Sequence, residues 1–184
     1  MKLKILLCSA FIAHNAMAVE SNTTQEGVKY IKMLGSALKT ELQSHMKNDP
    51  SGLEALSFCT GSAQSITQKI NAKLPKYAKV RRTALKVRNH SNKPDATDIK
   101  VIQTYTKAIA SKTFHADDIK TIIEGNTTRV YKPLLAQKVC LKCHGSTLSP
   151  QIKNALHSAY PKDEAVGYKE GDLRGVIVSE IKKH

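Results

Sequence analysis

The chain has no tryptophan among its 184 residues, and aromatic residues make up only 5% of it. Proteins that stack nucleic-acid bases use aromatic side chains, so this scarcity argues against a nucleic-acid partner despite a net charge of +14. Acidic residues are also scarce, with 15 against 29 lysines and arginines. The excess cations suit pairing with the carboxylates of a bound group, or attraction of an acidic partner protein.

Long apolar segments are missing as well. No segment reaches the roughly 20 consecutive apolar residues that a membrane-spanning helix needs. The N-terminus carries a shorter pattern: two lysines, an apolar stretch at 5–13 and a small-x-small site at 16–18. This order is typical of a secretory signal peptide. We therefore expect residues 1–18 to be removed on export, leaving residues 19–184 in the periplasm without a membrane span.

The chain also lacks a low-complexity linker and an internal repeat. Residues 19–184 are enough to bury a sizeable core in one domain. We therefore expect a single domain after the signal peptide.

Helical periodicity dominates the first third of the chain. Apolar residues recur three and four apart over residues 23–47, and an Asn-Asp-Pro triplet ends the pattern. A second helix is expected to begin at Ser51, where Glu54 would complete a capping box, and to end before Pro75. Cys59 lies on the apolar stripe in the middle of this second helix.

The rest of the chain favours strands with helices between them. We expect, in order, a strand over 79–88, a helix capped by Asp95 and bearing Ile99 to Ile109, a hairpin of 119–123 and 128–131 around Gly125-Asn126, a helix near 149–158 and a strand over 172–179. This order predicts an α+β fold in which N-terminal helices pack on an antiparallel sheet.

Residues 140–144 read Cys-Leu-Lys-Cys-His. A Cys-x-x-Cys-His run is the attachment signature of a c-type haem: Cys140 and Cys143 would form thioethers to the porphyrin, and His144 would bind the iron. The alternatives are a redox Cys-x-x-Cys pair or half of a zinc site. A zinc site needs a second ligand pair at similar spacing, and the sequence has no second Cys-x-x-Cys and no His-x-x-x-His. We therefore expect one covalent haem c.

One further cysteine needs an explanation. Loss of Cys8 with the signal peptide would leave three cysteines: Cys140 and Cys143 of the motif, and Cys59. An unpaired thiol in an exported protein is a candidate ligand, yet buried free cysteine often only fills a core. Both interpretations of Cys59 remain open on this argument.

Several motifs, in this order, resemble a family of exported c-haem domains with a PAS-like fold, found alone or as the sensor module of histidine kinases. The resemblance spans nearly all of residues 19–184 and adds to the haem signature itself. The motifs are Arg82–Asn89, Asn92–Asp95, Tyr131–Leu134, Cys140–Gly145, Tyr160–Asp163, Gly167-Tyr168 and Gly171–Gly175.

The resemblance implies that a helix-borne cysteine is the second axial ligand, opposite the motif histidine. Cys59 matches that position. The sequence departs from the family pattern at Ala84, His90 and Thr97. His90 matters most among these, because its imidazole would compete for the iron if its loop folds over the haem.

Three arginines are candidate partners for the haem propionates, because a guanidinium pairs with a carboxylate in a bidentate fork. They are Arg82, Arg88 and Arg174, and an ordinary surface or sheet-edge position is the alternative for each. The other rival iron ligands have simpler explanations. We interpret Met33 and Met46 as helix-face filler, His45 and His157 as cations near helix ends, and His115 as a loop residue.

These features predict a periplasmic mono-haem cytochrome-like protein that senses redox state or a small gas (NO, CO or O₂) through His144 and Cys59. A simple electron-transfer cytochrome is the alternative. A haem enzyme of the peroxidase type is less favoured, because it would need a distal acid–base group and only His90 is available. A separate redox or signalling partner protein would read the state of the haem.

Overall fold

The computed structural model describes residues 8–115 and 117–183, with side chains from residue 22. The predicted signal peptide falls in part on residues 1–7, which lie outside the described residues. The elements are α1 (Cys8–Asn48), α2 (Leu53–Gly61), α3 (Ala63–Asn71), β1 (Ala78–Thr83), α4 (Ala96–Ala110), β2 (Lys120–Glu124), β3 (Thr127–Leu135), α5 (Leu141–His144), α6 (Pro150–Ala159) and β4 (Leu173–Lys182), with 3₁₀ turns at His90–Asn92 and Lys138–Cys140.

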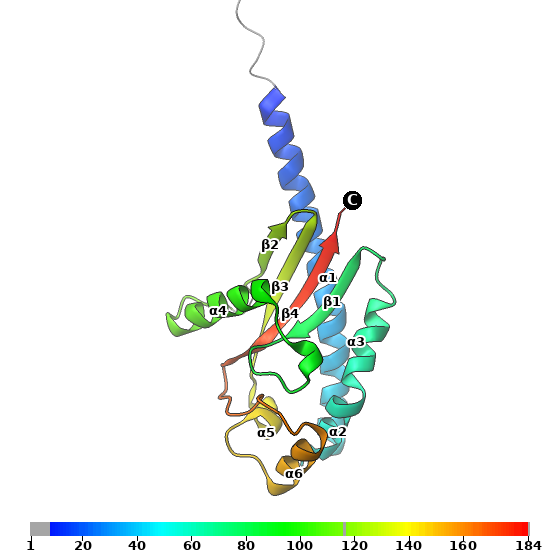
Figure 1. The fold of residues 1–184 in the computed structure, drawn as a ribbon, viewed down its shortest axis with the longest axis vertical. Helices are drawn as coiled ribbons and strands as arrows, with labels where there is room; N and C mark the ends of the chain where they lie inside the picture. The colour runs from blue at the N-terminus through cyan, green and yellow to red at the C-terminus, as the bar shows by residue number, and fades with distance from the viewer. Residues whose placement is uncertain (1–7, 116, 184) are drawn as a thin grey trace, which may run out of the picture.

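The strands form one antiparallel sheet in the order β1-β4-β3-β2 (Figure 1). Strands β2 and β3 form the predicted hairpin, with the turn at Gly125 and Asn126. Strand β4 lies between β1 and β3, so it joins two parts of the chain that precede it. Helices and an antiparallel sheet in one unit confirm the α+β prediction.

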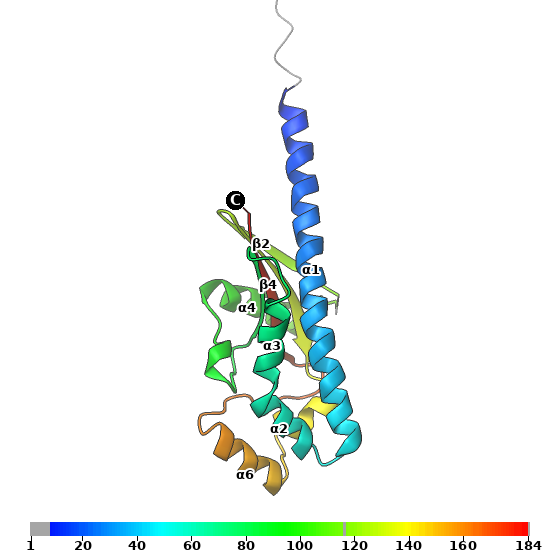
Figure 2. The same cartoon turned by 90° about the vertical axis from the view of Figure 1, so that its right-hand side faces the viewer.

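Helix α1 packs along one face of the sheet (Figure 2). Its buried side chains, including Ile31 and Leu34, share a core with Val130 of β3 and Ile177 of β4. Gly27 permits this close approach, because a Cβ there would lie 2.5 Å from a methyl carbon of Val130. The helix is longer than the predicted 23–47: it begins at Cys8, and no proline interrupts the chain from there to Asn48.

The prediction of one helix between Ser51 and Pro75 was wrong. The segment forms two helices, α2 and α3, and the first ends at Gly61, a residue with low helix propensity. The predicted Ser51–Glu54 capping box is also absent. The carboxylate of Asp49 instead accepts hydrogen bonds from the backbone N–H groups of Ser51 (2.8 Å) and Glu54 (3.0 Å).

Helix α4 covers the other face of the sheet, where Val101, Ile102 and Tyr105 pack on Tyr131 of β3 and on β4. Asp95 caps this helix as predicted, accepting a hydrogen bond from the Asp98 N–H at 2.9 Å. Strand β1 is shorter than the predicted 79–88. It ends at Thr83, and residues 84–89 continue as a loop that leaves the sheet.

Helices α2, α5 and α6 gather at the end of the sheet where β1 and β3 end and β4 begins (Figure 1). Helix α6, at Pro150–Ala159, matches the helix predicted near 149–158. Over the described residues, no helix combines the length and the apolar character needed to cross a bilayer. The region around α2, α5 and α6 is where the predicted site residues meet.

Candidate functional site

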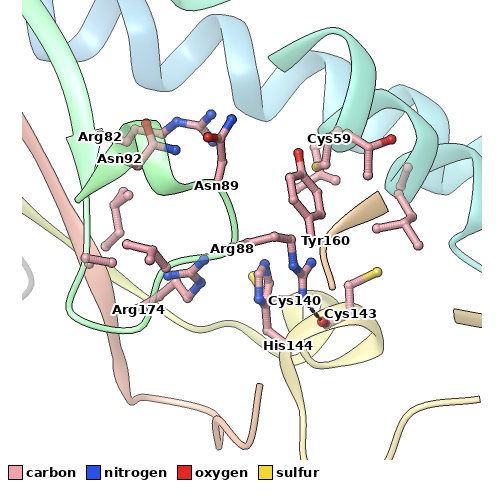
Figure 3. Close-up of a pocket in the computed structure, with 18 of the residues that line it drawn as sticks. Cys59, Arg82, Arg88, Asn89, Asn92, Cys140, Cys143, His144, Tyr160 and Arg174 are labelled. Atoms are coloured by element: carbon pink, nitrogen blue, oxygen red, sulfur yellow. Dashed lines mark hydrogen bonds between the residues drawn. The ribbon is translucent and has the colours of Figure 1, made fainter. Parts of the chain in front are cut away.

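A cavity opens between this end of the sheet and helices α1, α2 and α5. All seven residues that the sequence nominated line it, although they come from four separate parts of the chain (Figure 3). They are Cys59, Arg82, Arg88, Cys140, Cys143, His144 and Arg174. The fold therefore brings the predicted site together in one place.

The Cys-x-x-Cys-His motif forms a compact turn. A 3₁₀ turn at Lys138–Cys140 runs directly into the short helix α5, which ends at His144. The thiols of Cys140 and Cys143 are free and both line the cavity. Gly145 then lets the chain leave α5, because a Cβ at this position would lie 2.5 Å from the carbonyl oxygen of Leu141.

The imidazole of His144 is held in one orientation. Its Nδ1 lies 2.6 Å from the carbonyl oxygen of Ala165. A carbonyl only accepts, so Nδ1 carries the proton and donates it, which leaves Nε2 with a free lone pair. Burial, followed by the charges of Arg174 and Arg88, lowers the pKa of His144 to about 3. The side chain is thus the neutral tautomer that binds a metal through Nε2.

Residues 163–168, here called the clasp, hold the motif from the outside. The backbone N–H of Tyr168 donates to the carbonyl of His144 at 2.9 Å. Arg88 joins the two segments: it pairs with Asp163 at 3.0 Å and donates to the carbonyl oxygen of Cys143 at 2.6 Å. Arg88 is only 8% exposed and its charge is matched by Asp163. The structure therefore gives it a role in positioning the motif.

Cys59 faces the motif from α2, on the opposite side of the cavity in Figure 3. It also packs against the core formed by α1 and the sheet, so core packing and a place in the cavity are compatible. Burial raises the pKa of the Cys59 thiol, although Arg82, Arg88 and Arg174 oppose this rise. A thiolate at this position therefore needs a nearby cation to offset its burial.

Arg82 and Arg174 differ from Arg88, because no carboxylate of the described residues lies within 4.0 Å of either guanidinium. Arg174 donates to the Lys86 carbonyl at 3.3 Å and lies over the ring of Tyr168, 5.3 Å from its centroid. Burial lowers the pKa of both arginines. Two partly buried cations without an acid beside them fit a ligand that carries carboxylates.

The rival iron ligands mostly lie elsewhere. His90 is exposed and does not line the cavity, His115 and His157 are exposed, His45 stacks on Phe58 at 5.1 Å, and Met33 packs against the α1 core. Met46 is the exception, because it lines the cavity and is not simple helix filler. Sequence reasoning also missed the polar lining residues Asn89, Asn92 and Tyr160.

The residues present fit a c-type haem. Two free thiols at the attachment spacing and an imidazole with a free Nε2 are the donors that such a group needs. The unmatched guanidinium groups suit its propionates. Apolar side chains such as Leu56, Val87 and Leu134 complete the wall.

Comparison with known proteins supports the fold. The crystal structure of the cyanobacterial haem-protein Tll0287 superposes with a TM-score of 0.61 at 22% sequence identity, covering 92% of this chain and 96% of that chain. No curated protein matches. A family profile described as Tll0287-like matches residues 9–181. The chain therefore belongs to the Tll0287-like family, and the predicted relationship to a family of haem domains is confirmed.

Proposed function

We propose that this chain is an exported c-type haem protein in which Cys140 and Cys143 form the thioethers and His144 is an axial iron ligand. The observation that carries the proposal is the hydrogen bond from His144 Nδ1 to Ala165, because it leaves Nε2 free in a cavity that also holds the free thiols. The similarity to a cyanobacterial haem protein supports it.

A haem bound here supplies an iron atom that exchanges one electron and can accept a small ligand. The chain's own residues orient and anchor it. Arg88 and the clasp fix the motif backbone, while Arg82 and Arg174 would pair with the propionates. The apolar part of the wall keeps water away and strengthens these charge interactions.

In this proposal Cys59 would be the second residue that holds the iron. Burial raises the pKa of the Cys59 thiol, so its thiolate would be stable only while the iron beside it carries enough positive charge. A lower positive charge at the iron would favour the protonated thiol of Cys59. Cys59 is carried by α2, which packs directly on α1, so a movement of Cys59 would act on both helices.

This coupling favours a periplasmic sensor of redox state or of a small gas (NO, CO or O₂), read by a separate partner protein. A simple electron-transfer cytochrome is the second candidate. The position of the motif favours it, because Val139 lines the cavity and is still 39% exposed, which brings the bound group close to the surface. Lys138 and Lys142, both exposed, would attract an acidic partner there.

Mass spectrometry of protein made in cells that mature c-type cytochromes tests covalent attachment. We expect the mass of the chain to rise by one haem, and the Cys140→Ala/Cys143→Ala variant to lose this gain. An unmodified mass for the parent protein would end the proposal.

Electron paramagnetic resonance and visible spectra of Cys59→Ala test the second ligand. We expect the low-spin thiolate signature of the ferric protein to disappear, while His90→Ala and Met46→Ala retain it. Reduction of the haem iron, followed by addition of CO, then distinguishes a sensor from an electron carrier. Loss of the thiolate on reduction followed by CO binding favours a sensor, and unchanged ligation without CO binding favours an electron carrier.

A further inference from the structure

Tyr160 presents a free hydroxyl to the cavity. The residue lines the cavity and is partly buried, yet no described residue hydrogen-bonds its hydroxyl oxygen. A phenol is both a donor and an acceptor, and it stays protonated at neutral pH. An unpartnered donor in a ligand cavity is a group that a ligand can use.

The surrounding structure fixes where this hydroxyl points. Tyr160 caps the end of α6: its N–H donates to Leu156 at 2.7 Å, and its carbonyl accepts from the Asp163 N–H at 3.0 Å. Its ring packs against the cluster that includes Leu56 and Leu156. Leu56 lies about one helical turn before Cys59 in α2. Figure 3 shows the hydroxyl directed toward Cys59 and away from His144.

We propose that the Tyr160 hydroxyl donates a hydrogen bond to a small exogenous ligand that enters the cavity beside Cys59. The ligand class is a neutral diatomic whose outer atom accepts a hydrogen bond, such as O₂ or NO, in preference to CO. This inference rests on the proposed haem function and narrows it from gases in general to hydrogen-bonding ones.

Two other polar groups of the wall suit this role less well. The Thr60 hydroxyl already donates to the Ser57 carbonyl at 2.9 Å. Arg82 carries a full charge that suits a carboxylate. Tyr160 is neutral, anchored at its backbone and directed to the Cys59 side, which is the geometry that a neutral ligand at that side requires.

The test uses the haem-loaded Cys59→Ala protein, in which the position beside α2 is open, with CO as the probe. Infrared spectroscopy compares the C–O stretch with and without Tyr160→Phe. We expect the stretch to move to higher frequency when the donor is removed. The ratio of O₂ to CO affinity should fall about tenfold, as expected for loss of one hydrogen bond. Thr60→Val removes another hydroxyl of the same wall and should change neither quantity.

An unchanged C–O stretch and an unchanged affinity ratio in Tyr160→Phe would overturn the inference while leaving the haem proposal intact. Failure of the Cys59→Ala protein to bind CO at all would also overturn it. A chain that carries no haem would instead remove the proposed function, and the inference with it. The two kinds of failure are therefore distinguishable.

Discussion

Arg81 and Arg82 are neighbours in β1, but their side chains project to opposite faces of the sheet. Arg81 turns toward α4, where it donates to both carboxylate oxygens of Asp98 at 2.9 and 3.1 Å and to Glu180 at 2.7 Å. Arg82 lines the cavity and has no carboxylate within 4.0 Å among the described residues. The same residue type thus has two different environments one position apart.

On the side toward α4, each arginine is paired with a carboxylate. Asp98 is fully buried and also accepts from the hydroxyl of Tyr131 at 3.0 Å. Arg129 donates to Asp95 at 2.6 Å. Arg81, Arg129, Asp95, Asp98 and Glu180, here called the α4 network, pair with one another and attach α4 to the sheet. Such a network belongs to the fold and leaves little charge for a ligand.

The cavity side is unbalanced. Arg82, Arg88 and Arg174 face it, and Asp163 is the carboxylate that pairs with one of them. Folding around unmatched cations costs free energy, and a ligand that carries carboxylates, such as the proposed haem, would offset that cost. The comparison teaches that the charge balance of arginines, more than their number, separates structural positions from a ligand site in this protein.

The largest expected effect is on the α4 network. Asp98→Ala leaves the partly buried guanidinium of Arg81 without its main partner, and we expect the free energy of unfolding to fall by about 3–5 kcal/mol. Urea denaturation followed by circular dichroism measures it. The haem spectrum of the folded fraction should stay the same. A loss below about 1 kcal/mol would show that the network is not structural.

Arg88→Gln should have a smaller but still marked effect, because it removes the charged hydrogen bonds to Asp163 and to the Cys143 carbonyl. We expect a loss of about 2–3 kcal/mol in the same assay. The visible haem spectrum of the variant should also become heterogeneous, because the Cys-x-x-Cys-His motif is held less firmly. Arg174→Gln is the matched control and should cost less. Equal losses would contradict the distinction between the two arginines.

Acid should lower the free energy of unfolding through groups on the cavity side and on the α4 side of the sheet, but in different pH ranges. In the haem-free Cys140→Ser/Cys143→Ser protein, the folded pKa of His144 is about 3 and its ordinary value is 6.5. The unfolded chain therefore takes up a proton first, and stability present above pH 6.5 is lost as the pH falls toward 3. At pH 5 the loss is up to about 2 kcal/mol relative to pH 7.

His144→Gln should abolish this loss between pH 7 and 5. On the α4 side, Asp95 affects the free energy of unfolding in a lower pH range. Burial alone raises the pKa of its carboxyl, but hydrogen bonds from the Asp98 N–H and Arg129 lower this pKa overall. Its contribution is present above pH 3.8 and lost below. Urea denaturation at pH 7, 5 and 3 measures both ranges. A pH 5 loss that persists in His144→Gln would contradict this assignment.

The smallest effect should come from Arg82→Gln in the haem-free protein. Removal of a cation that has no acid partner should leave the free energy of unfolding within about 0.5 kcal/mol or raise it. With haem attached, the same change should destabilise the protein, because a propionate loses its partner. Arg81→Gln should destabilise both forms alike. A destabilised haem-free Arg82→Gln protein would mean that Arg82 is structural.

Local signals predicted much of the fold. The Asp95 cap, the turn at Gly125-Asn126 and the α6 helix depend on neighbouring residues, and the structure contains all three. The division of α2 from α3 was missed because apolar periodicity continues across Gly61 and Ser62. Asp49 was taken only as a helix stop, although its carboxylate accepts from two N–H groups beyond it.

The site was predictable where chemistry depends on residue type and spacing, as in the Cys-x-x-Cys-His run. It was not predictable where the contribution is a backbone atom or a distant partner. Ala165 contributes only a carbonyl, and Asp163 lies 75 residues from Arg88. Because side chains alternate between the two faces along β1, Arg81 and Arg82 must lie on opposite faces of the sheet. The sequence does not say which of these faces borders the cavity. Axial ligation by Cys59 stays a prediction.

The central strand β4 and the clasp both follow the Cys-x-x-Cys-His motif in the sequence. A chain delivered N-terminus first thus exposes its two attachment thiols while the sheet still lacks the strand that joins β1 to β3. The imidazole obtains its carbonyl partner only after Ala165 arrives. Under the proposed function, cofactor insertion would therefore have an interval during export, which would close when the downstream residues complete the domain.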